Sequence, residues 1–392
     1  MRPKVVITGI GVVSALGVGV EANLSALQRG ESGIRPVRYL FTEHREFPVG
    51  EVPVSEQEFC RMLNLPAGRI YSRTHLLGVV ALREALMTAN LQGYKGLALI
   101  SGTTVGGMDV TERYFPNPQP TGRDIHDCGA STNEIADSCG DFDYTATVST
   151  ACSSAMNALI MGKLLIESGE RDIVIAGGAE ALSRFHFNGF KSLMIMDKER
   201  CRPFDKSRAG LNLGEGAAYL VLEREESALK RGVEILGVFS GAGNACDAFH
   251  QTASSEDGEG ACRAMTQALD DAGIVPSQID YVNAHGTGTP NNDVSESAAL
   301  RRVFGNVLPP VSSTKSYTGH TTSASGSIEA VFCLMAIRNG FLPFQNEFQT
   351  IDEQCVVPIT ESNALSNVFR NIMCNAFGFG GNDSSIILSR YE

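Results

Sequence analysis

Short β-branched runs alternate with longer helical patterns along almost the whole of this 392-residue chain. Brief apolar runs predict buried strands, and longer stretches with apolar residues every three or four positions predict helices. The expected strands are Val5 to Gly9, Leu97 to Ser101, Asp172 to Ala176, Ala217 to Leu222, Gly237 to Ala242, Tyr281 to Ala284, Asn371 to Asn375 and Ser385 to Leu388. The expected helices are Glu21 to Gln28, Ser72 to Ala89, Ser153 to Ser168, Gly258 to Ala272, Asp293 to Phe304 and Ser325 to Arg338. This alternation predicts an α/β fold with parallel or mixed sheets covered by helices.

The chain is longer than a single small core usually serves, so we expect two halves. The charged stretch Glu223 to Gly232 predicts a helix that joins them, which divides the chain into residues 1–232 and 233–392. No Pro/Ser-rich linker separates the halves, so they should pack closely. The polar segment Pro116 to Ser138 predicts a surface loop, or else a wall of a substrate channel or a dimer contact.

The formal charge of −12 argues against a nucleic-acid partner. The 10 cysteines are scattered without Cys-x-x-Cys pairs, which predicts reduced thiols in a cytoplasmic protein and no zinc site. The apolar run from Val5 to Val13 could begin a signal peptide, but its β-branched residues fit a buried strand better. No apolar run reaches the length needed to span a membrane, so we predict no membrane insertion.

Cys152 is the strongest nucleophile candidate. It lies in a run of small residues, Val148 to Ala155, directly before the helical pattern Met156 to Ile166. Free N–H groups and the positive end of the helix dipole should favour its thiolate. The alternative is a buried, inert cysteine, which is the reading we give to Cys262 and Cys333.

Two histidines stand in rigid Gly/Thr-rich turns. His285 belongs to Asn283-Ala284-His285-Gly286-Thr287-Gly288-Thr289-Pro290, and His320 ends Ser313-Thr314-Lys315-Ser316-Tyr317-Thr318-Gly319-His320. Neutral imidazoles can donate hydrogen bonds to a developing oxyanion, so this pair could stabilise an enolate. Core histidines are one alternative, and metal ligands are a weaker one because no carboxylates stand at a recognisable ligand spacing.

Other residues are expected to support such a site. Lys315, enclosed by small neighbours, needs a partner, for which Glu329 is the candidate. Asp293 and Glu296 lie one helical turn apart and should orient the loop after His285, although solvated charges are the alternative. Phe379, in the glycine-rich stretch Asn375 to Asp383, could act as a movable gate.

Taken together, these motifs resemble the elongating β-ketoacyl-acyl carrier protein synthases, or ketosynthases, of the thiolase-like superfamily. The resemblance runs along nearly the whole chain. Its motifs are Val5-Val6-Ile7-Thr8-Gly9-Ile10-Gly11, Thr150-Ala151-Cys152-Ser153-Ser154, Ala176-Gly177-Gly178-Ala179-Glu180, Arg202-Pro203-Phe204-Asp205, Gly214-Glu215-Gly216-Ala217, the His285 turn, the Lys315–His320 turn and Gly378-Phe379-Gly380-Gly381.

The resemblance implies a decarboxylative Claisen condensation. Cys152 would carry an acyl chain as a thioester, and His285 and His320 would bind the malonyl thioester carbonyl and stabilise the enolate. The backbone N–H groups of Cys152 and Phe379 would form the oxyanion hole. Lys315 and Glu329 would support the site.

The same resemblance implies a five-layer α-β-α-β-α fold built from two related halves. No metal or organic cofactor is implied, because phosphopantetheine arrives on the acyl carrier protein. A homodimer is expected, with a heterodimer containing a ketosynthase-like paralogue as the alternative. An acidic carrier protein would need a basic patch at the channel mouth. Its expected members are Arg69, Arg73, Lys191, Lys206 and Arg208.

The chain departs from the family pattern at several loops. Ala209-Gly210-Leu211-Asn212 replaces the usual Asp-Gly-Phe-Val, and Thr321-Thr322-Ser323-Ala324-Ser325-Gly326 replaces an apolar pair followed by Gly-Ala-Ala-Gly. Gly380-Gly381-Asn382-Asp383 replaces Gly-Gly-Thr-Asn, and the segment before the nucleophile is shortened. The more polar loops favour a dedicated synthase for polyene, aryl-polyene or polyketide chains over general fatty acid elongation.

Other readings fit less well. A biosynthetic thiolase would carry a second cysteine in a Cys-x-Gly turn, but Cys374 is followed by Asn375-Ala376. A non-catalytic chain-length partner subunit would generally lack the nucleophile, and an acyltransferase-only paralogue would work beside a second ketosynthase. A dehydrogenase would need more than Gly9-Ile10-Gly11, because Ser14 stands where the third glycine belongs.

Overall fold

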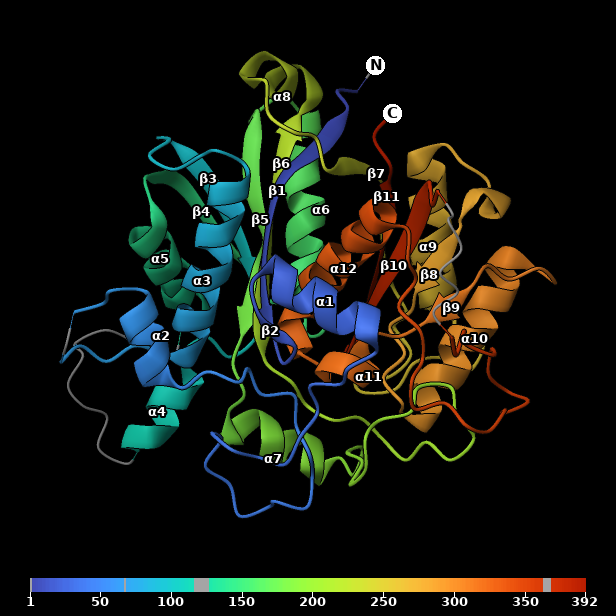
Figure 1. Ribbon diagram of the computed structural model, residues 1–392. Coiled ribbons are helices and arrows are strands. Elements are labelled where there is room, and N and C mark those ends of the chain that lie inside the picture. Colours follow the sequence, from blue (N-terminus) through green and yellow to red (C-terminus); the bar gives the residue numbers. More distant parts are fainter. Residues whose placement is uncertain (1, 67, 116–126, 362–367) are drawn as a thin grey trace.

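The computed structural model describes residues 2–66, 68–115, 127–361 and 368–392. Its helices and strands lie in five layers, which Figure 1 shows from left to right as helices, sheet, helices, sheet and helices. Both termini lie at the top, near α8, and α7 lies at the opposite end (Figure 1). The fold is therefore the layered α/β fold that the family resemblance implies.

The strands form one continuous hydrogen-bonded sheet that folds into two layers. Its order is β4-β3-β5-β6-β1-β7-β11-β10-β8-β9, with the short β2 paired to β1. The strands are β1 (Val5–Ser14), β2 (Gly17–Val18), β3 (Leu97–Gly102), β4 (Phe142–Val148), β5 (Ile173–Glu180), β6 (Gly216–Arg224), β7 (Gly237–Cys246), β8 (Tyr281–Asn283), β9 (Val311–Ser312), β10 (Asn371–Gly378) and β11 (Asn382–Ser389).

The two layers repeat one topology. Without β2, each layer has five strands, which can be numbered in chain order. From the outer edge of the sheet to the β1–β7 contact, both layers then have the order third, second, fourth, fifth, first. In both layers the outer strands pair in parallel and the last two pairs are antiparallel. Among the described strands, the two layers are joined by the pairing of Val6 with Val238 and of Ile7 with Gly237. We propose from this repetition that residues 1–232 and 233–392 are two related halves.

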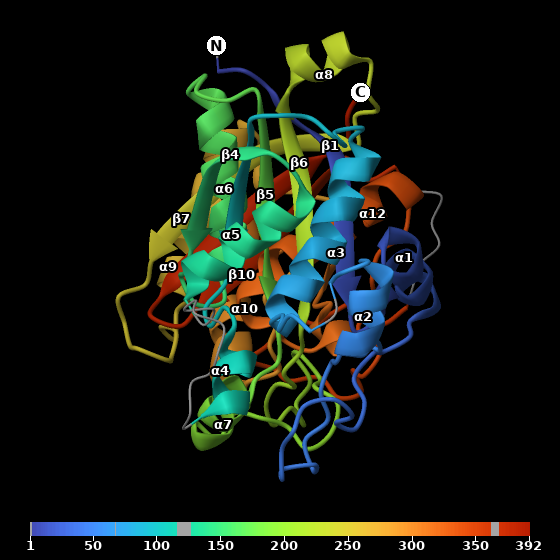
Figure 2. The same ribbon diagram turned by 90° about the vertical axis from the view of Figure 1, so that its left-hand side faces the viewer.

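Helices cover both layers and fill the space between them. In Figure 1, α6 and α12 lie between the sheets, α3 and α5 cover the outer face of one, and α9 and α10 cover the other. Figure 2 shows α3 and α5 lying across their sheet. The helices are α1 (Val20–Arg29), α2 (Glu56–Met62), α3 (Arg73–Thr88), α4 (Met108–Tyr114), α5 (Cys128–Cys139), α6 (Ser154–Glu167), α7 (Arg184–Ser192), α8 (Glu225–Arg231), α9 (Glu259–Ala272), α10 (Pro290–Phe304), α11 (Lys315–Thr318) and α12 (Ser325–Asn339).

The central layer is apolar on all sides because it contacts both sheets. The helix α12 is buried continuously from Ser325 to Ile337, and its side chains join those of α6 in the largest core cluster. Such a helix shows no amphipathic stripe. The packing of α12 in this core fixes the position of the loop that precedes its N-terminal end.

Each of the expected strands and helices overlaps an observed element of the same type, and the charged stretch Glu223 to Gly232 contains α8. The loop expected from Pro116 to Ser138 needs a correction. Residues 116–126 lie outside the described residues, and Cys128–Cys139 form α5, whose N-cap Asp127 accepts a hydrogen bond from the Gly129 N–H. Across the described ranges, no helix is long and apolar enough to cross a membrane.

Candidate active site

Cys152 lies in the turn between β4 and α6. Ala151 before it has a φ of 51°, a left-handed conformation that non-glycine residues seldom adopt. The Ser154 hydroxyl braces this turn, since it donates to the Ala151 carbonyl at 2.6 Å and accepts from the Thr150 N–H at 2.9 Å. The turn thus directs Cys152 into a cavity of about 380 Å³.

The two predicted histidines line the same cavity. His320 Nε2 lies 3.1 Å from Cys152 Sγ, and the rings of His285 and His320 lie 5.3 Å apart at 84°. Cys152 comes from the first half of the chain, whereas both histidines come from the second. The site therefore exists only because the halves pack together.

Both imidazoles are neutral in this environment. Burial and the nearby Lys315 charge hold the pKa of His285 and the pKa of His320 well below their usual value. A neutral imidazole can donate one hydrogen bond and accept another. The pair can therefore offer N–H donors to a developing negative charge without carrying a positive charge of its own.

The expectation of a resting thiolate at Cys152 needs a correction. Burial raises the pKa of the Cys152 thiol to about 11 and outweighs Lys315 and the backbone N–H groups of Phe379 and Cys152, which lower the pKa. The helix α6 begins at Ser154, but Cys152 is only 4% exposed, so water does not help to solvate a thiolate. The resting group is a thiol that is surrounded by donors for a negative charge.

Asp293 and Glu296, which we expected to orient the loop after His285, both accept hydrogen bonds from its backbone. Glu296 accepts the N–H groups of His285 at 2.8 Å and Gly286 at 2.7 Å. Asp293 accepts the N–H groups of Phe204 at 2.7 Å and Gly288 at 3.2 Å. Both carboxyls lie on α10 and are buried. Burial raises the pKa of Glu296 to about 7.

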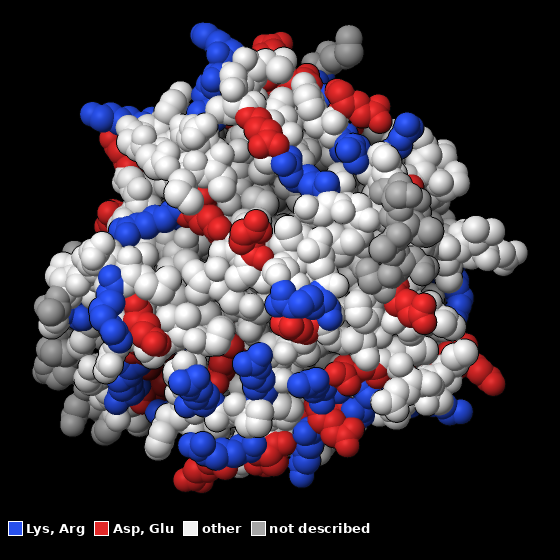
Figure 3. Space-filling view, viewed as in Figure 1, with Lys and Arg blue, Asp and Glu red and all other residues white. Residues whose placement is uncertain are grey.

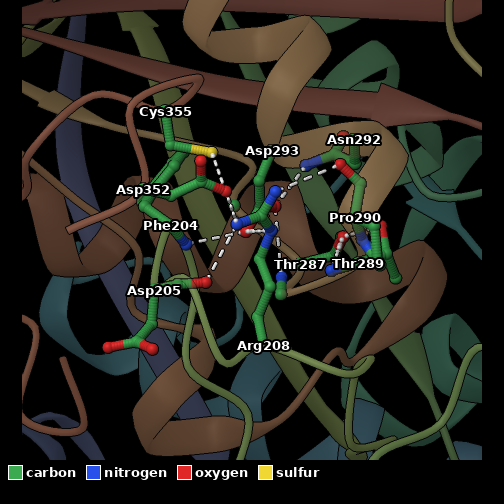
Figure 4. Close-up of polar contacts among 12 residues, drawn as sticks. Phe204, Asp205, Arg208, Thr287, Thr289, Pro290, Asn292, Asp293, Asp352 and Cys355 are labelled. Atoms are coloured by element: carbon green, nitrogen blue, oxygen red, sulfur yellow. Dashed lines mark hydrogen bonds and ion pairs between the residues drawn. The ribbon is translucent and has the colours of Figure 1, made fainter. Parts of the chain in front are cut away.

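Arg208 closes the cluster around Asp293, which Figure 4 shows together with the Thr287–Pro290 turn. Its guanidinium lies 2.6 Å from Asp352 Oδ2 and 3.7 Å from Asp293 Oδ2, and it donates to the Pro290 carbonyl at 3.4 Å. The cluster ties the turn after His285 to two distant segments of the chain.

Lys315 and Glu329 form the predicted pair. Lys315 Nζ lies 2.6 Å from Glu329 Oε1, and the two side chains are 1% and 3% exposed. Burial raises the pKa of Glu329 to about 7, against the lowering effect of Lys315. The pair lies behind the histidines, and the Lys315 charge acts on both of their pKa values.

Phe379, which we expected to act as a gate, lines the cavity. Its ring stacks on Phe190 from α7, with centroids 5.7 Å apart. Gly380 and Gly381 follow with φ of 84° and 78°, and the Gly380 N–H donates to the Gln251 carbonyl. Two glycines in the left-handed region give this segment the backbone freedom that a hinge requires.

Two of the five expected docking residues are not accessible. The Arg73 side chain is 7% exposed and is paired with Glu215 at 2.6 Å. The Arg208 side chain is 5% exposed and is paired with Asp352. Both arginines hold the fold together, and we remove them from the docking surface.

The other three lie on the surface, but not together. Arg69 is paired with Glu134 at 3.5 Å and lines a separate cleft of about 740 Å³ beside α2. Lys191 lies on α7 directly after the cavity residue Phe190, and Lys206 is exposed on the loop before Leu211, another cavity residue. Only Lys191 and Lys206 therefore adjoin the cavity.

The sequence did not predict the polar residues along the cavity wall, nor Phe190, which stacks on Phe379. Phe190 has no motif of its own, because its contact with Phe379 joins positions far apart in the chain. The polar wall includes the two threonines of the His285 turn, so the density of hydroxyl and amide residues in and beside that turn could have revealed it. Its residues are Thr252, Ser254, Thr287, Thr289, Asn291 and Asn292.

Among the residues that the structure describes, no cluster of three or more His, Cys, Asp or Glu side chains could hold a metal ion. The cavity instead combines a thiol, two neutral imidazoles, backbone N–H donors and a polar wall. This set of groups suits acyl transfer and enolate stabilisation.

Comparison with known proteins agrees with this chemistry. Residues 2–228 match the family model "Beta-ketoacyl synthase, N-terminal domain", and residues 236–349 match "Beta-ketoacyl synthase, C-terminal domain". The "3-oxoacyl-[acyl-carrier-protein] synthase 2" of Synechocystis sp. is 31% identical, with 100% of this chain and 99% of that protein covered.

Two solved structures show the same fold over their full length. "The ishigamide ketosynthase/chain length factor" has a TM-score of 0.94 and 34% identity, with 100% of both chains covered. A type II polyketide synthase acyl carrier protein in complex with its ketosynthase has a TM-score of 0.86 and 26% identity, again with 100% of both chains covered.

Proposed function

The chain belongs to the β-ketoacyl synthase family of acyltransferases, and we propose that it extends an acyl chain held on Cys152 by decarboxylative condensation with a malonyl thioester. The observation that carries this proposal is the 3.1 Å approach of His320 Nε2 to Cys152 Sγ, beside the second neutral histidine, His285. A thiol nucleophile and two N–H donors in one cavity match the two half-reactions of such a condensation.

In the first half-reaction Cys152 takes the acyl group. Its Sγ attacks the carbonyl carbon of the incoming thioester, and the bond from that carbon to the carrier's sulfur breaks. The Cys152 thiol proton passes to the departing sulfur, so the carrier leaves as a thiol. The backbone N–H groups of Cys152 and Phe379 both lower the pKa of the Cys152 thiol, which supports their role as the oxyanion hole for the acyl carbonyl. Because the resting thiol has a raised pKa, we expect those donors to lower the barrier of this half-reaction more than that of the second.

In the second half-reaction the malonyl thioester loses carbon dioxide. The electron pair of the broken carbon–carbon bond passes into an enolate, whose oxygen accepts N–H donors from His285 and His320. The enolate carbon then attacks the acyl carbonyl on Cys152, a new carbon–carbon bond forms, and the cysteine sulfur leaves. Lys315, paired with Glu329, keeps both imidazoles neutral throughout.

The acyl groups would arrive on the phosphopantetheine arm of an acyl carrier protein, with no further cofactor. The hydroxyl and amide side chains around the His285 turn suit the amide groups of that arm. Basic residues, with acidic residues among them, lie on the lower part of the face in Figure 3, over α7 and the loop after it. We propose Lys191, Lys198, Arg200 and Lys206 as the docking surface for the acidic carrier protein.

Charge reversal tests this docking surface. The triple variant Lys191→Glu, Lys198→Glu, Lys206→Glu should weaken carrier-protein binding by about tenfold or more at low salt, measured by calorimetry. The control Lys230→Glu changes an exposed lysine on α8, at the opposite end of the molecule, and should bind normally. Equal affinity in the triple variant would remove the docking proposal.

We propose a dimer as the working assembly. Among the described residues β4 is an edge strand of the sheet, and an edge strand can pair with a strand of a second chain. A homodimer is our first choice. The complex of a similar ketosynthase with a chain length factor supports a heterodimer as the alternative. Light scattering of the purified protein, alone and with a co-expressed paralogue, distinguishes the two.

The polar departures from the family pattern, at residues 209–212, 321–326 and 380–383, favour polyene or polyketide substrates over long saturated fatty acids. The test mixes the protein with malonyl-carrier protein and a panel of saturated and polyunsaturated acyl-carrier proteins, and measures the masses of the carrier-bound products. We expect extension by two carbons, preferentially of unsaturated primers, and its loss in Cys152→Ala. Efficient extension of long saturated chains without preference would contradict the substrate proposal.

A chain-length partner subunit or an acyltransferase-only paralogue is the second candidate. The complete set of Cys152, His285 and His320 argues against a non-catalytic subunit. Acyl transfer to Cys152 without extension of any primer would favour this candidate, and the assay should then be repeated with the partner present.

A further inference from the structure

The turn after His320 places hydroxyl groups behind the imidazole, on the side away from Cys152. His320 Nδ1 lies 3.0 Å from Ser325 Oγ, and Ser325 Oγ lies 3.2 Å from Thr321 Oγ1. On its other side the ring presents Nε2 to Cys152 Sγ at 3.1 Å. All four side chains are buried. The partner of Nδ1 therefore decides which ring nitrogen carries the proton.

Two directions of hydrogen bonding are possible along this chain of groups. In the first, Thr321 donates to Ser325, Ser325 donates to Nδ1, and the ring proton is on Nε2. In the second, Nδ1–H donates to Ser325 and Ser325 donates to Thr321. The Thr321 hydrogen then has no acceptor, because Thr321 Oγ1 has no other hydrogen-bond partner within the described ranges.

The first direction is favoured by the cost of an unsatisfied donor. Thr321 is 2% exposed, so water cannot accept the stranded hydroxyl hydrogen of the second direction. The second direction would let the Cys152 thiol donate to Nε2, but a thiol is a weak donor and compensates little. Each hydroxyl hydrogen and the ring hydrogen finds an acceptor only when the hydrogen bonds are donated in the direction from Thr321 towards Cys152.

We propose that Ser325 is a positioning residue which, braced by Thr321, holds His320 in the tautomer that carries its proton on Nε2. His320 then stands as a fixed donor towards Cys152 Sγ and the reacting thioester, and does not accept the thiol proton. Both hydroxyls belong to the segment Thr321–Ser325, in which this chain departs from the apolar pattern of its family. The catalytic consequence rests on the proposed function, whereas the tautomer is a property of the resting protein.

The tautomer can be read directly from nitrogen NMR of protein labelled with ¹⁵N-histidine. The His320 resonances are assigned by comparison with His320→Gln. We expect the wild type to show protonated Nε2 and unprotonated Nδ1. In Ser325→Ala the ratio of the two tautomers should fall by about tenfold, as expected for the loss of one neutral hydrogen bond.

Two variants separate this effect from a general loss of structure. Ser325→Thr keeps the hydroxyl and should restore the wild-type spectrum. Ser327→Ala removes a buried hydroxyl from the same helix that bonds only the Ala324 carbonyl, so it should leave the His320 signals unchanged. Thr321→Val removes the brace and should give an intermediate ratio.

Steady-state kinetics supply the functional readout. In Ser325→Ala we expect kcat for condensation to fall by about tenfold with little change in KM, which is less than the 100- to 1,000-fold loss on removing an oxyanion donor outright. Ser327→Ala should retain the wild-type kcat.

The proposal is overturned if wild-type His320 carries its proton on Nδ1, or if Ser325→Ala keeps both the wild-type tautomer and the wild-type kcat. A protein that shows the tautomer shift but condenses no substrate would contradict the proposed function and leave the role of Ser325 intact.

Discussion

Lys315 illustrates how single buried charges hold this site together. Its only close carboxylate among the described residues is Glu329, at 2.6 Å. In Lys315→Met the carboxylate of Glu329 loses its counter-charge, and we expect the free energy of unfolding at pH 8 to fall by about 3–5 kcal/mol. Urea unfolding measures this loss.

The double variant Lys315→Met, Glu329→Leu is the control, because it removes both charges and should recover most of the stability. The deficit of the single variant should also be smaller at pH 6 than at pH 8, since a lone buried carboxyl escapes its penalty by binding a proton. If the double variant loses as much free energy of unfolding as Lys315→Met alone, the ion-pair account is contradicted.

Residues with a local motif could be predicted from the sequence, and residues defined by distant contacts could not. Cys152, His285, His320 and Lys315 stand in turns whose small residues mark them, and the structure brings all four together. Phe190 and Ser325 matter through a ring stack and a hydrogen bond that no local pattern encodes. The thiolate expectation for Cys152 was wrong because it counted the helix dipole and could not count burial.

At the scale of elements, the close approach of α12 to α6 sets the distance between His320 and Cys152. α6 begins two residues after Cys152, and α12 begins five residues after His320. A Cβ on Gly326 would stand 2.7 Å from Met156 Cβ and 3.0 Å from its backbone nitrogen. Gly326→Ala must therefore push the two helices apart.

We expect Gly326→Ala to lose about 1–3 kcal/mol of stability through overpacking. It should also slow acylation of Cys152 as His320 moves away. Calorimetry and the rate of acyl-enzyme formation measure the two effects. Gly189→Ala, on the exposed face of α7 with nothing within 4 Å of the added carbon, is the matched control and should change neither. Unchanged acylation in Gly326→Ala would show that this contact does not set the catalytic distance.

Two of the elements that the sequence did not predict, β4 and α5, lack a strong apolar pattern. β4 is only half-buried and alternates apolar and polar residues from Phe142 to Val148, so it lacks the continuous apolar run of the buried strands. α5 lies in a segment of polar composition, and its burial of Ile135 and Ala136 against α3 is a tertiary contact. The central strands and long helices were predictable because elements buried on two faces have a strong apolar pattern in the sequence.

At the scale of the whole molecule, buried acids with raised pKa values make stability depend on pH. Burial raises the pKa of Asp109 to about 7, of Glu296 to about 7 and of Asp383 to about 8. The unfolded chain releases these protons near pH 4, so the folded state binds more protons and loses stability as pH rises to about 8. The buried neutral histidines oppose this trend only below their unfolded pKa of about 6.5.

The free energy of unfolding should therefore fall between pH 6.5 and pH 8.5. Asp383→Asn should remove about 1–2 kcal/mol of that fall, because it takes away the group that ionises last. Urea titrations at the two pH values measure the difference, with the exposed Asp141→Asn as control. The account fails if Asp383→Asn and wild type lose the same stability over this range.

The most direct test of the central claim is intact-protein mass spectrometry of the acyl-enzyme. The protein is first incubated with an acyl-carrier protein and then with malonyl-carrier protein labelled with ¹³C at the free carboxyl. We predict an acyl adduct on Cys152 that disappears on addition of the malonyl thioester, with release of labelled carbon dioxide and a carrier-bound product two carbons longer. An adduct on another residue, or one that persists while labelled carbon dioxide is released, would contradict condensation at Cys152.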